Sequence, residues 1–401
     1  MRLLLLTRSE RARLDSQDGY LALESDVYLK KLEEPSVYKT VTDSLYEVDQ
    51  NAFDFLQKCD GSLKVRELNP PADFLEYLLN ENLASLPENA CVNEIKVGTN
   101  LKPSLRYLLV EITSRCNLAC RHCYQGEAKA VDLDMDILSQ LADDFEDIGG
   151  LRLIISGGEP LLHPGFKEIN RLVKGRAFRS ILLSNGTLID ENHIADMGFN
   201  EVQISLDGLE DGHDYLRGKG SFQKSISALK LLKERGVPVS IASMVHSQNW
   251  HEFEQMKEIV KGLGAVSWSI DVPSESGRLT GRQEILPPLD KLKSILEMQF
   301  GSEIHDSKSD LVCGAHLGCV QSSGIFTKCG FYTNRTGGHI GEGMRKCWLN
   351  LPRMRLSELA CDCEFLKECR GGCRYRAECY NGEKGADPIK CRIYGINTVA
   401  G

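Results

Sequence analysis

A regular alternation of strand-like and helix-length segments between Arg106 and Val272 limits what this chain can fold into. The strand-like runs are Tyr107 to Ile112, Leu151 to Ile155, Ser180 to Ser184, Glu201 to Leu206, Val237 to Met244 and Val266 to Asp271. This alternation is typical of consecutive βα units on a parallel sheet. We therefore predict an α/β fold with six units, whereas a closed barrel needs eight.

Functional residues of such sheets lie in the loops that follow the carboxyl ends of the strands. Four polar or cysteine-containing motifs of this chain fall there, one after each of the first four predicted strands. In chain order they are Cys116-Asn117-Leu118-Ala119-Cys120-Arg121-His122-Cys123, Gly157-Gly158-Glu159-Pro160, Ser184-Asn185-Gly186 and Ser205-Leu206-Asp207-Gly208. The sequence thus predicts one site at this end of the sheet.

Length and charge exclude several classes of protein. The 401 residues predict two to three domains, and the net charge of -9 disfavours nucleic-acid binding. No segment approaches the roughly 18 apolar residues of a membrane span. The apolar run Leu3 to Leu6 is too short for a secretion signal. We expect a soluble, cytoplasmic protein that binds neither nucleic acid nor membrane.

The cysteines are numerous and unevenly placed. Of the 15, three lie between positions 116 and 123, ten lie in the last 89 residues, and only Cys59 and Cys91 lie elsewhere. A reducing cytoplasm makes disulfides a weak explanation and favours metal or iron-sulfur ligation. Cys116, Cys120 and Cys123 could hold three irons of a [4Fe-4S] cluster and leave the fourth iron open. A zinc site is the alternative, although it would usually offer a second CxxC pair nearby.

This CxxxCxxC loop after the first strand resembles the radical SAM superfamily. The resemblance implies a partial (β/α)6 barrel, here residues 104–285, in which S-adenosylmethionine (SAM) binds the open iron and is cleaved to a 5′-deoxyadenosyl radical. It further implies that Gly157, Gly158 and Glu159 contact the methionyl ammonium, and that Arg217 pairs with the SAM carboxylate. The ribose and methionyl groups would be hydrogen-bonded by Ser184, Asn185, Ser205 and Asp207.

The C-terminal cysteines, within residues 286–401, resemble the SPASM domain, which carries two auxiliary [4Fe-4S] clusters. By this resemblance Cys313, Cys319, Cys329 and Cys373 would bind the nearer cluster, and Cys361, Cys363, Cys369 and Cys391 the farther one. The family usually has CxxC where this chain has Cys361-Asp362-Cys363. Cys347 could therefore take the place of Cys361, or the farther cluster could keep an open site. A zinc ribbon would use only four of these thiolates.

Residues 1–95 are predicted to form a separate α+β unit. Four short strand-like runs between Tyr20 and Val48 precede three helical segments, the first capped by Asp49 and the third spanning Pro71 to Leu83. The order suggests a winged-helix-like unit, and it resembles the RiPP recognition element, a PqqD-like module. That resemblance implies binding of the leader of a ribosomally made precursor peptide as an added strand. A wedge that only packs on the barrel is the alternative.

Together the resemblances imply a maturase that abstracts a hydrogen from a peptide and installs a cross-link, either thioether or carbon-carbon. An enzyme that epimerises Cα would carry the same sequence motifs. The sequence does not identify the substrate peptide. An electron donor such as flavodoxin or ferredoxin is expected. Alternatives are a sulfatase maturase, which normally has an aspartate where Gly330 follows Cys329, an enzyme acting on haem or another small cofactor, and an iron-sulfur scaffold without turnover.

Overall fold

The computed structural model describes residues 18–127, 129–301, 304–305 and 309–396, so the run Leu3 to Leu6 lies outside the described residues. The chain forms two compact units. The first comprises residues 1–104 together with 146–151 and 176–179, and the second comprises the rest of the chain.

The first unit contains two small antiparallel sheets. In one sheet, β1 (Tyr20–Leu23) lies between β5 (Asp60–Lys64) and β6 (Ala84–Ser85). The other sheet is a meander of β2 (Val27–Lys31), β3 (Pro35–Lys39) and β4 (Ser44–Glu47). The four predicted strands are therefore present, each within two residues of its expected start.

Strands β5 and β6 were not predicted, because Asp60-Gly61-Ser62 looks like a break between two helices. Gly61 has a φ of +83°, and a Cβ on it would lie 2.3 Å from the Cys91 carbonyl oxygen. The glycine therefore lets β5 run close beside the segment that contains Cys91. That contact depends on a distant part of the chain, which a local turn pattern does not reveal.

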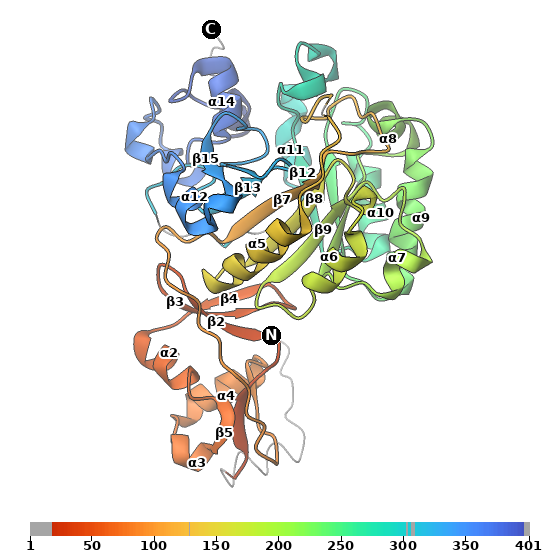
Figure 1. The fold of residues 1–401 in the computed structure, drawn as a ribbon. Helices are drawn as coiled ribbons and strands as arrows, with labels where there is room; N and C mark the ends of the chain where they lie inside the picture. Colours follow the sequence, from red (N-terminus) through yellow and green to blue (C-terminus); the bar gives the residue numbers. More distant parts are fainter. Residues whose placement is uncertain (1–17, 128, 302–303, 306–308, 397–401) are drawn as a thin grey trace. The chain divides into compact units, whose positions relative to one another are not determined.

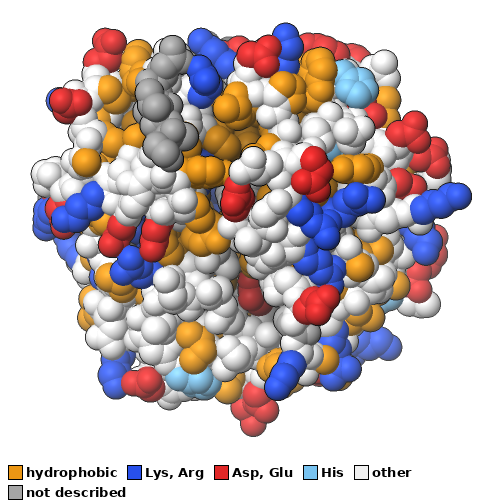
Figure 2. Space-filling model, turned by 90° about the horizontal axis from the view of Figure 1, so that it is seen from above, with side chains coloured by type: hydrophobic (Ala, Val, Ile, Leu, Met, Phe, Trp, Pro, Cys, Tyr) orange, Lys and Arg blue, Asp and Glu red, His pale blue; other side chains and the backbone are white. Residues whose placement is uncertain are grey.

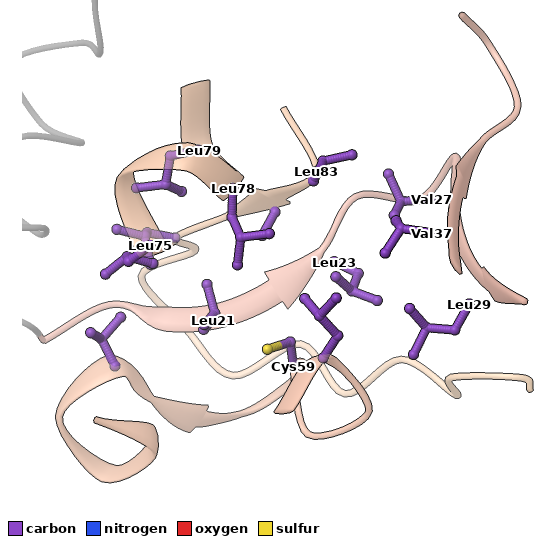
Figure 3. Close-up of a cluster of buried hydrophobic side chains, with 14 of the residues drawn as sticks. Leu21, Leu23, Val27, Leu29, Val37, Cys59, Leu75, Leu78, Leu79 and Leu83 are labelled. Atoms are coloured by element: carbon purple, nitrogen blue, oxygen red, sulfur yellow. The ribbon is translucent and has the colours of Figure 1, made fainter. Parts of the chain in front are cut away.

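The described residues of this unit also form the helices α2 (Gln50–Leu56), α3 (Val65–Leu68) and α4 (Ala72–Asn80). The Asp49 side chain accepts a hydrogen bond from Ala52 N at 2.8 Å, so the predicted N-cap is confirmed. Helix α4 turns Leu75, Leu78 and Leu79 inward. Figure 3 shows these leucines converging with side chains from β1, β2 and β3 on one hydrophobic core.

The second unit is built on a parallel sheet. Its strands follow one another in chain order: β7 (Tyr107–Thr113), β8 (Arg152–Gly157), β9 (Arg179–Ser184), β10 (Glu201–Ser205), β11 (Val239–Met244) and β12 (Ser267–Asp271). The pairs β7–β8, β9–β10, β10–β11 and β11–β12 are parallel, and β8 lies beside β9. The predicted α/β class and the six strands are thus confirmed, and the closing of this sheet into a partial barrel stays a prediction.

The helices between these strands lie along the sheet (Figure 1). They are α5 (Met135–Asp147), α6 (Phe166–Leu172), α7 (Glu191–Ala195), α8 (Glu210–Arg217), α9 (Ser221–Glu234) and α10 (Phe253–Leu263). Strand β7 is buried along almost its full length, as expected for a parallel strand covered on both faces. Among the described residues, no helix has the length and apolar character needed to cross a bilayer.

The cysteine-rich C-terminal region extends the same sheet. β13 (Leu317–Val320) pairs in parallel with β7, and β14 (Ile325–Thr327) and β15 (Thr336–His339) follow as antiparallel strands. Within the described ranges the sheet thus has nine strands. Helix α11 (Leu292–Leu296) precedes this region and packs against β12. The region itself contains the short helices α12 (Met344–Asn350), α13 (Leu366–Cys369), α14 (Arg374–Asn381) and α15 (Pro388–Ile393).

Candidate active site

Hydrogen bonds and an ion pair hold both ends of the loop that carries Cys116, Cys120 and Cys123. At its start, Thr113 donates to Asp132 at 2.6 Å, and Arg115 forms a 2.9 Å ion pair with the same carboxylate. At its end, the Cys123 carbonyl accepts a hydrogen bond from Arg278 N at 2.9 Å. The three thiols are therefore presented by a loop that has little freedom to move relative to β7.

All three cysteines line one cavity of about 570 Å³ at the carboxyl ends of the strands. Figure 2 views this end of the second unit, and the face is hollowed near its middle. Six of the eight predicted SAM-contacting residues line the same cavity: Gly157, Gly158, Ser184, Asn185, Ser205 and Arg217. The structure thus brings together residues from the ends of three strands, from the loop after β7 and from helix α8, as the strand-end argument predicts.

Gly157 and Gly158 bring the end of β8 against the backbone that leads to Cys116. A Cβ on Gly157 would lie 2.3 Å from Thr113 O, and one on Gly158 would lie 2.3 Å from Arg115 O. The Gly158 and Glu159 amides donate to those same two carbonyls at 2.7 and 2.8 Å. Glycine is therefore required here by close backbone approach.

Glu159 does not line the cavity. Its carboxylate is fully buried and accepts hydrogen bonds from Ser184 Oγ and Asn185 N, both at 2.8 Å. Burial raises the pKa of Glu159 to about 7, against the opposing effect of these donors. In this structure the side chain fixes the end of β9, and its contact with SAM stays a prediction.

Asp207 also lies behind the cavity wall. Its carboxylate forms a buried ion pair with Arg217 Nε and accepts a 2.7 Å hydrogen bond from Met244 N. Although burial opposes ionisation, the nearby Arg217 guanidinium and the hydrogen bonds hold the pKa of Asp207 well below its ordinary value. Asp207 therefore orients Arg217, and it is Arg217 that faces the cavity.

The cavity suits an iron-sulfur cluster and SAM by the chemistry of its lining. It offers three thiols, hydroxyl and amide groups, and the cation Arg217. His122 Nδ1 is buried with no hydrogen-bond partner among the described residues, although the ring faces this cavity. Across the described ranges, no three His, Cys, Asp or Glu side chains converge on one metal ion.

Two further groups at this site were not predicted. Asp271, the last residue of β12, lines the cavity, and its carboxylate makes no hydrogen bond or ion pair within the described part of the chain. Tyr124 also lines the cavity and donates to the buried Glu111 at 2.6 Å. Asp271 could have been found from its place at the end of the sixth strand. Tyr124 directly follows Cys123, but nothing in the sequence pairs it with Glu111.

The predicted ligands of the nearer cluster influence one another electrostatically. Burial raises the pKa of each of the four thiols. In each case another thiol of the set raises it further. The Cys329 thiol raises the pKa of Cys313 and that of Cys319. The Cys373 thiol raises the pKa of Cys329. We call these four residues, Cys313, Cys319, Cys329 and Cys373, the near group.

The predicted ligands of the farther cluster form a second set. Burial raises the pKa of Cys391 to about 11, and Cys361, Cys369 and Cys363 raise it further. We call these four residues the outer group. Cys347 lies elsewhere, buried at α12, where its thiol donates to the His339 carbonyl at 3.2 Å. Cys361, and not Cys347, is therefore among the thiols that raise the pKa of Cys391.

The first unit has an apolar groove of about 440 Å³ beside β4, the last strand of its sheet. The groove lies between β4 and α4, and its lining includes Tyr46, Val48, Phe74, Tyr77 and Leu78. An edge strand carries unpaired backbone N–H and C=O groups on its outer side. The groove therefore combines a hydrogen-bonding edge with an apolar wall.

Comparison with known proteins gives the same picture for the second unit. Residues 110–260 match the model of the Radical SAM superfamily. The chain is 31% identical over 249 residues to the antilisterial bacteriocin subtilosin biosynthesis protein AlbA of Bacillus subtilis, which is 60% of this chain and 55% of AlbA. It is 27% identical over 330 residues to an AdoMet-dependent heme synthase of Methanosarcina barkeri, covering 69% of this chain and 93% of that protein.

Among solved structures, the chain resembles Streptococcus suis SuiB bound to its precursor peptide SuiA. The TM-score is 0.68 at 14% identity, over 93% of this chain and 100% of SuiB. This likeness shows a shared fold. The match to AlbA spans about half of that protein's length. The motif loop, the two glycines and Arg217 all fall inside the matched range, and residues 110–260 of this chain form a radical SAM domain.

Proposed function

We propose that this protein is a radical SAM enzyme that modifies a ribosomally made peptide. One observation carries the proposal: the three loop cysteines share a single cavity with the two glycines that follow β8 and with Arg217. The names of AlbA, a bacteriocin biosynthesis protein, and of SuiB bound to a precursor peptide support peptide chemistry.

Each part of the cavity has a task in this proposal. The three thiolates would hold the cluster, and Arg217, fixed by Asp207, would bind the SAM carboxylate. Ser184, Asn185 and Ser205 offer hydrogen bonds to the remaining polar groups. When bound, the reduced cluster and SAM supply a radical that abstracts a hydrogen atom. The chain itself orients both groups and keeps water away from them.

The near and outer groups would each hold an auxiliary [4Fe-4S] cluster. The clustering of the two sets of thiols supports this assignment, and the distant position of Cys347 favours Cys361 as the fourth outer ligand. Formation of a thioether or carbon-carbon cross-link is a net oxidation of the peptide. The auxiliary clusters would accept the electrons that the peptide loses. The thiolates require a reducing compartment, so we place the enzyme in the cytoplasm, with flavodoxin or ferredoxin as electron donor.

The first test is reconstitution with iron and sulfide without oxygen, followed by SAM and dithionite. We expect about twelve irons per chain and 5′-deoxyadenosine, detected by mass spectrometry. The variant Cys116→Ala/Cys120→Ala/Cys123→Ala should lose about four irons and all deoxyadenosine. Cys91→Ala removes an exposed thiol outside every predicted site and is the matched control. Deoxyadenosine formation by the triple variant at the wild-type rate would refute the assignment of these ligands.

The groove beside β4 is the proposed leader site. A bound leader would add a strand to β4 and place apolar side chains against Tyr46 and Phe74. Short peptides encoded beside the gene, fluorescently labelled, are the probes for anisotropy measurements. Tyr46→Ser should weaken binding at least tenfold and leave peptide-independent deoxyadenosine formation unchanged. Tyr20→Ser, which removes a half-buried tyrosine on β1 outside the groove, should leave binding unchanged.

A second candidate substrate is a tetrapyrrole. The relative from Methanosarcina barkeri is named a heme synthase, and 93% of its length is covered. One experiment distinguishes the peptide from the tetrapyrrole. Deoxyadenosine formation is measured in the presence of an iron porphyrin, in the presence of the peptides and in the absence of both. Stimulation by the porphyrin alone would replace the peptide proposal.

A further inference from the structure

Asp271 is a charged residue of the cavity to which the proposed function gives no task. It ends β12, the outermost strand on one side of the nine-stranded sheet, and its side chain is open to the cavity. Within the described residues its carboxylate has no hydrogen bond and no ion pair. The carboxylate is therefore available to a group that enters the cavity.

The strand register places Asp271 on the face of the sheet that carries Ser205. Ser205 lies beside Ala242 of β11, and Ala242 lies beside Ser269 of β12. Side chains alternate along a strand, so Asp271, two residues after Ser269, points to the same side. β12 lies two strands beyond β10, which is about 10 Å across the sheet. Asp271 therefore lies apart from Ser205, with the small side chain of Ala242 between their strands.

The cations near Asp271 do not neutralise it. Protein surrounds the side chain away from the cavity and raises the pKa of Asp271 by desolvation, while the Arg376 guanidinium lowers it. That guanidinium already donates to the Asp387 carboxylate, from Nε at 2.8 Å and from Nη2 at 2.7 Å. Arg278 lines the same cavity, but in the described part of the chain it forms no ion pair with Asp271. One negative charge at the cavity thus has no counter-charge in contact.

A substrate that fills the cavity displaces the water that solvates this carboxylate. An ionised group that loses its water without gaining a counter-charge is strongly unfavourable. A neutral donor such as a backbone N–H would leave the charge of Asp271 uncompensated. A cationic group of the substrate would compensate it and add a charge-assisted hydrogen bond. The cavity therefore favours a substrate that brings a positive charge to the end of β12.

We propose that Asp271 binds a cationic side chain, lysine or arginine, of the peptide segment that enters the cavity. The inference rests on the proposed function and deepens it, because it names a chemical feature of the substrate. The ion pair forms and breaks no covalent bond. Asp271 is thus a specificity-determining residue, which holds the segment in the cavity and disfavours peptides that have no cation at that position.

The test is a double-mutant cycle between enzyme and peptide. The probes are the precursor peptide encoded beside the gene and a version with norleucine in place of each lysine and arginine outside the leader. The reconstituted full chain is supplied with saturating SAM, and modified peptide is quantified by mass spectrometry. Asp271→Asn should raise the KM for the unaltered peptide about tenfold, and the norleucine peptide should have the same effect on the wild-type enzyme. Both changes together should cause no further loss.

Two variants separate the ion pair from a structural effect. Asp271→Lys should restore modification of a peptide with glutamate in place of the cation, which a structural role of the aspartate would not do. Glu254→Gln is the matched control, because Glu254 is an exposed carboxylate on α10 that does not line the cavity. It should leave the KM for both peptides unchanged. Equilibrium dialysis should give Asp271→Asn the wild-type affinity for SAM.

Each outcome decides a different point. Modification of the peptide with additive effects of the two changes would overturn the inference and leave the proposed function in place. Modification of a precursor without lysine or arginine outside its leader would do the same. A tenfold loss of SAM affinity in Asp271→Asn would assign the carboxylate to SAM and overturn the inference. Absence of 5′-deoxyadenosine from the wild-type enzyme, or its stimulation by the porphyrin alone, would refute the proposed function itself.

Discussion

Gly158→Ala tests whether the close approach of β8 to the cysteine loop controls the site. The added Cβ would lie 2.3 Å from Arg115 O, 2.7 Å from Arg115 C and 2.9 Å from Ser114 O, whereas ordinary contact begins at 3.4 Å. All three atoms belong to the backbone, so no side chain can turn away. The strand leading to Cys116 must move by about 1 Å, and overpacking of this kind costs about 1–3 kcal/mol.

A displacement of about 1 Å also lowers the rate of a positioned reaction roughly 100-fold. We therefore expect Gly158→Ala to unfold at a lower urea concentration and to form 5′-deoxyadenosine about 100-fold more slowly. Gly262→Ala in α10 is the control, since apart from its chain neighbours and the backbone of its own helix no atom lies within 4 Å of the added Cβ. That change should stabilise the protein by about 1 kcal/mol and leave the rate unchanged. Wild-type stability and rate in Gly158→Ala would refute the reasoning.

Three further predictions concern buried or capping carboxylates. Because burial raises the pKa of Glu159 from 4.5 to about 7, the unfolding free energy of the cofactor-free protein should fall as pH rises through that range, by on the order of 3 kcal/mol. Urea titrations of Glu159→Gln should not show this fall. Asp207→Asn leaves the Arg217 charge buried without its partner, so it should cost about 3–5 kcal/mol in urea unfolding and weaken SAM binding measured by equilibrium dialysis. Asp49→Ala removes an N-cap and should cost about 1 kcal/mol in urea unfolding without changing deoxyadenosine formation.

The parallel sheet and the position of the site could be predicted because their signals are local. Strand-forming runs recur at regular intervals, and the chemistry-bearing motifs directly follow them. The Asp49 cap is equally local, since it depends on residues within one helical turn. Such features can be predicted without knowing which distant segments of the chain lie beside them in the folded protein.

Side-chain direction could not be predicted in the same way. Glu159 and Asp207 stand at the expected strand ends, but each turns behind the cavity wall to a partner on another strand or helix. The hydrogen bond from Tyr124 to Glu111 likewise joins residues whose pairing has no sequence signal. Strand β5 was mistaken for a break because its partners lie in distant segments.

The pairing of β13 with β7 has a consequence for dissecting this protein. β7 is the strand that leads to the cysteine loop, and β13 covers its outer edge over four residues. A shortened protein that ends before Leu317 would present that edge to solvent, and open edges pair with other chains. The radical SAM domain released in this way should therefore aggregate, so its chemistry has to be studied in the full-length chain.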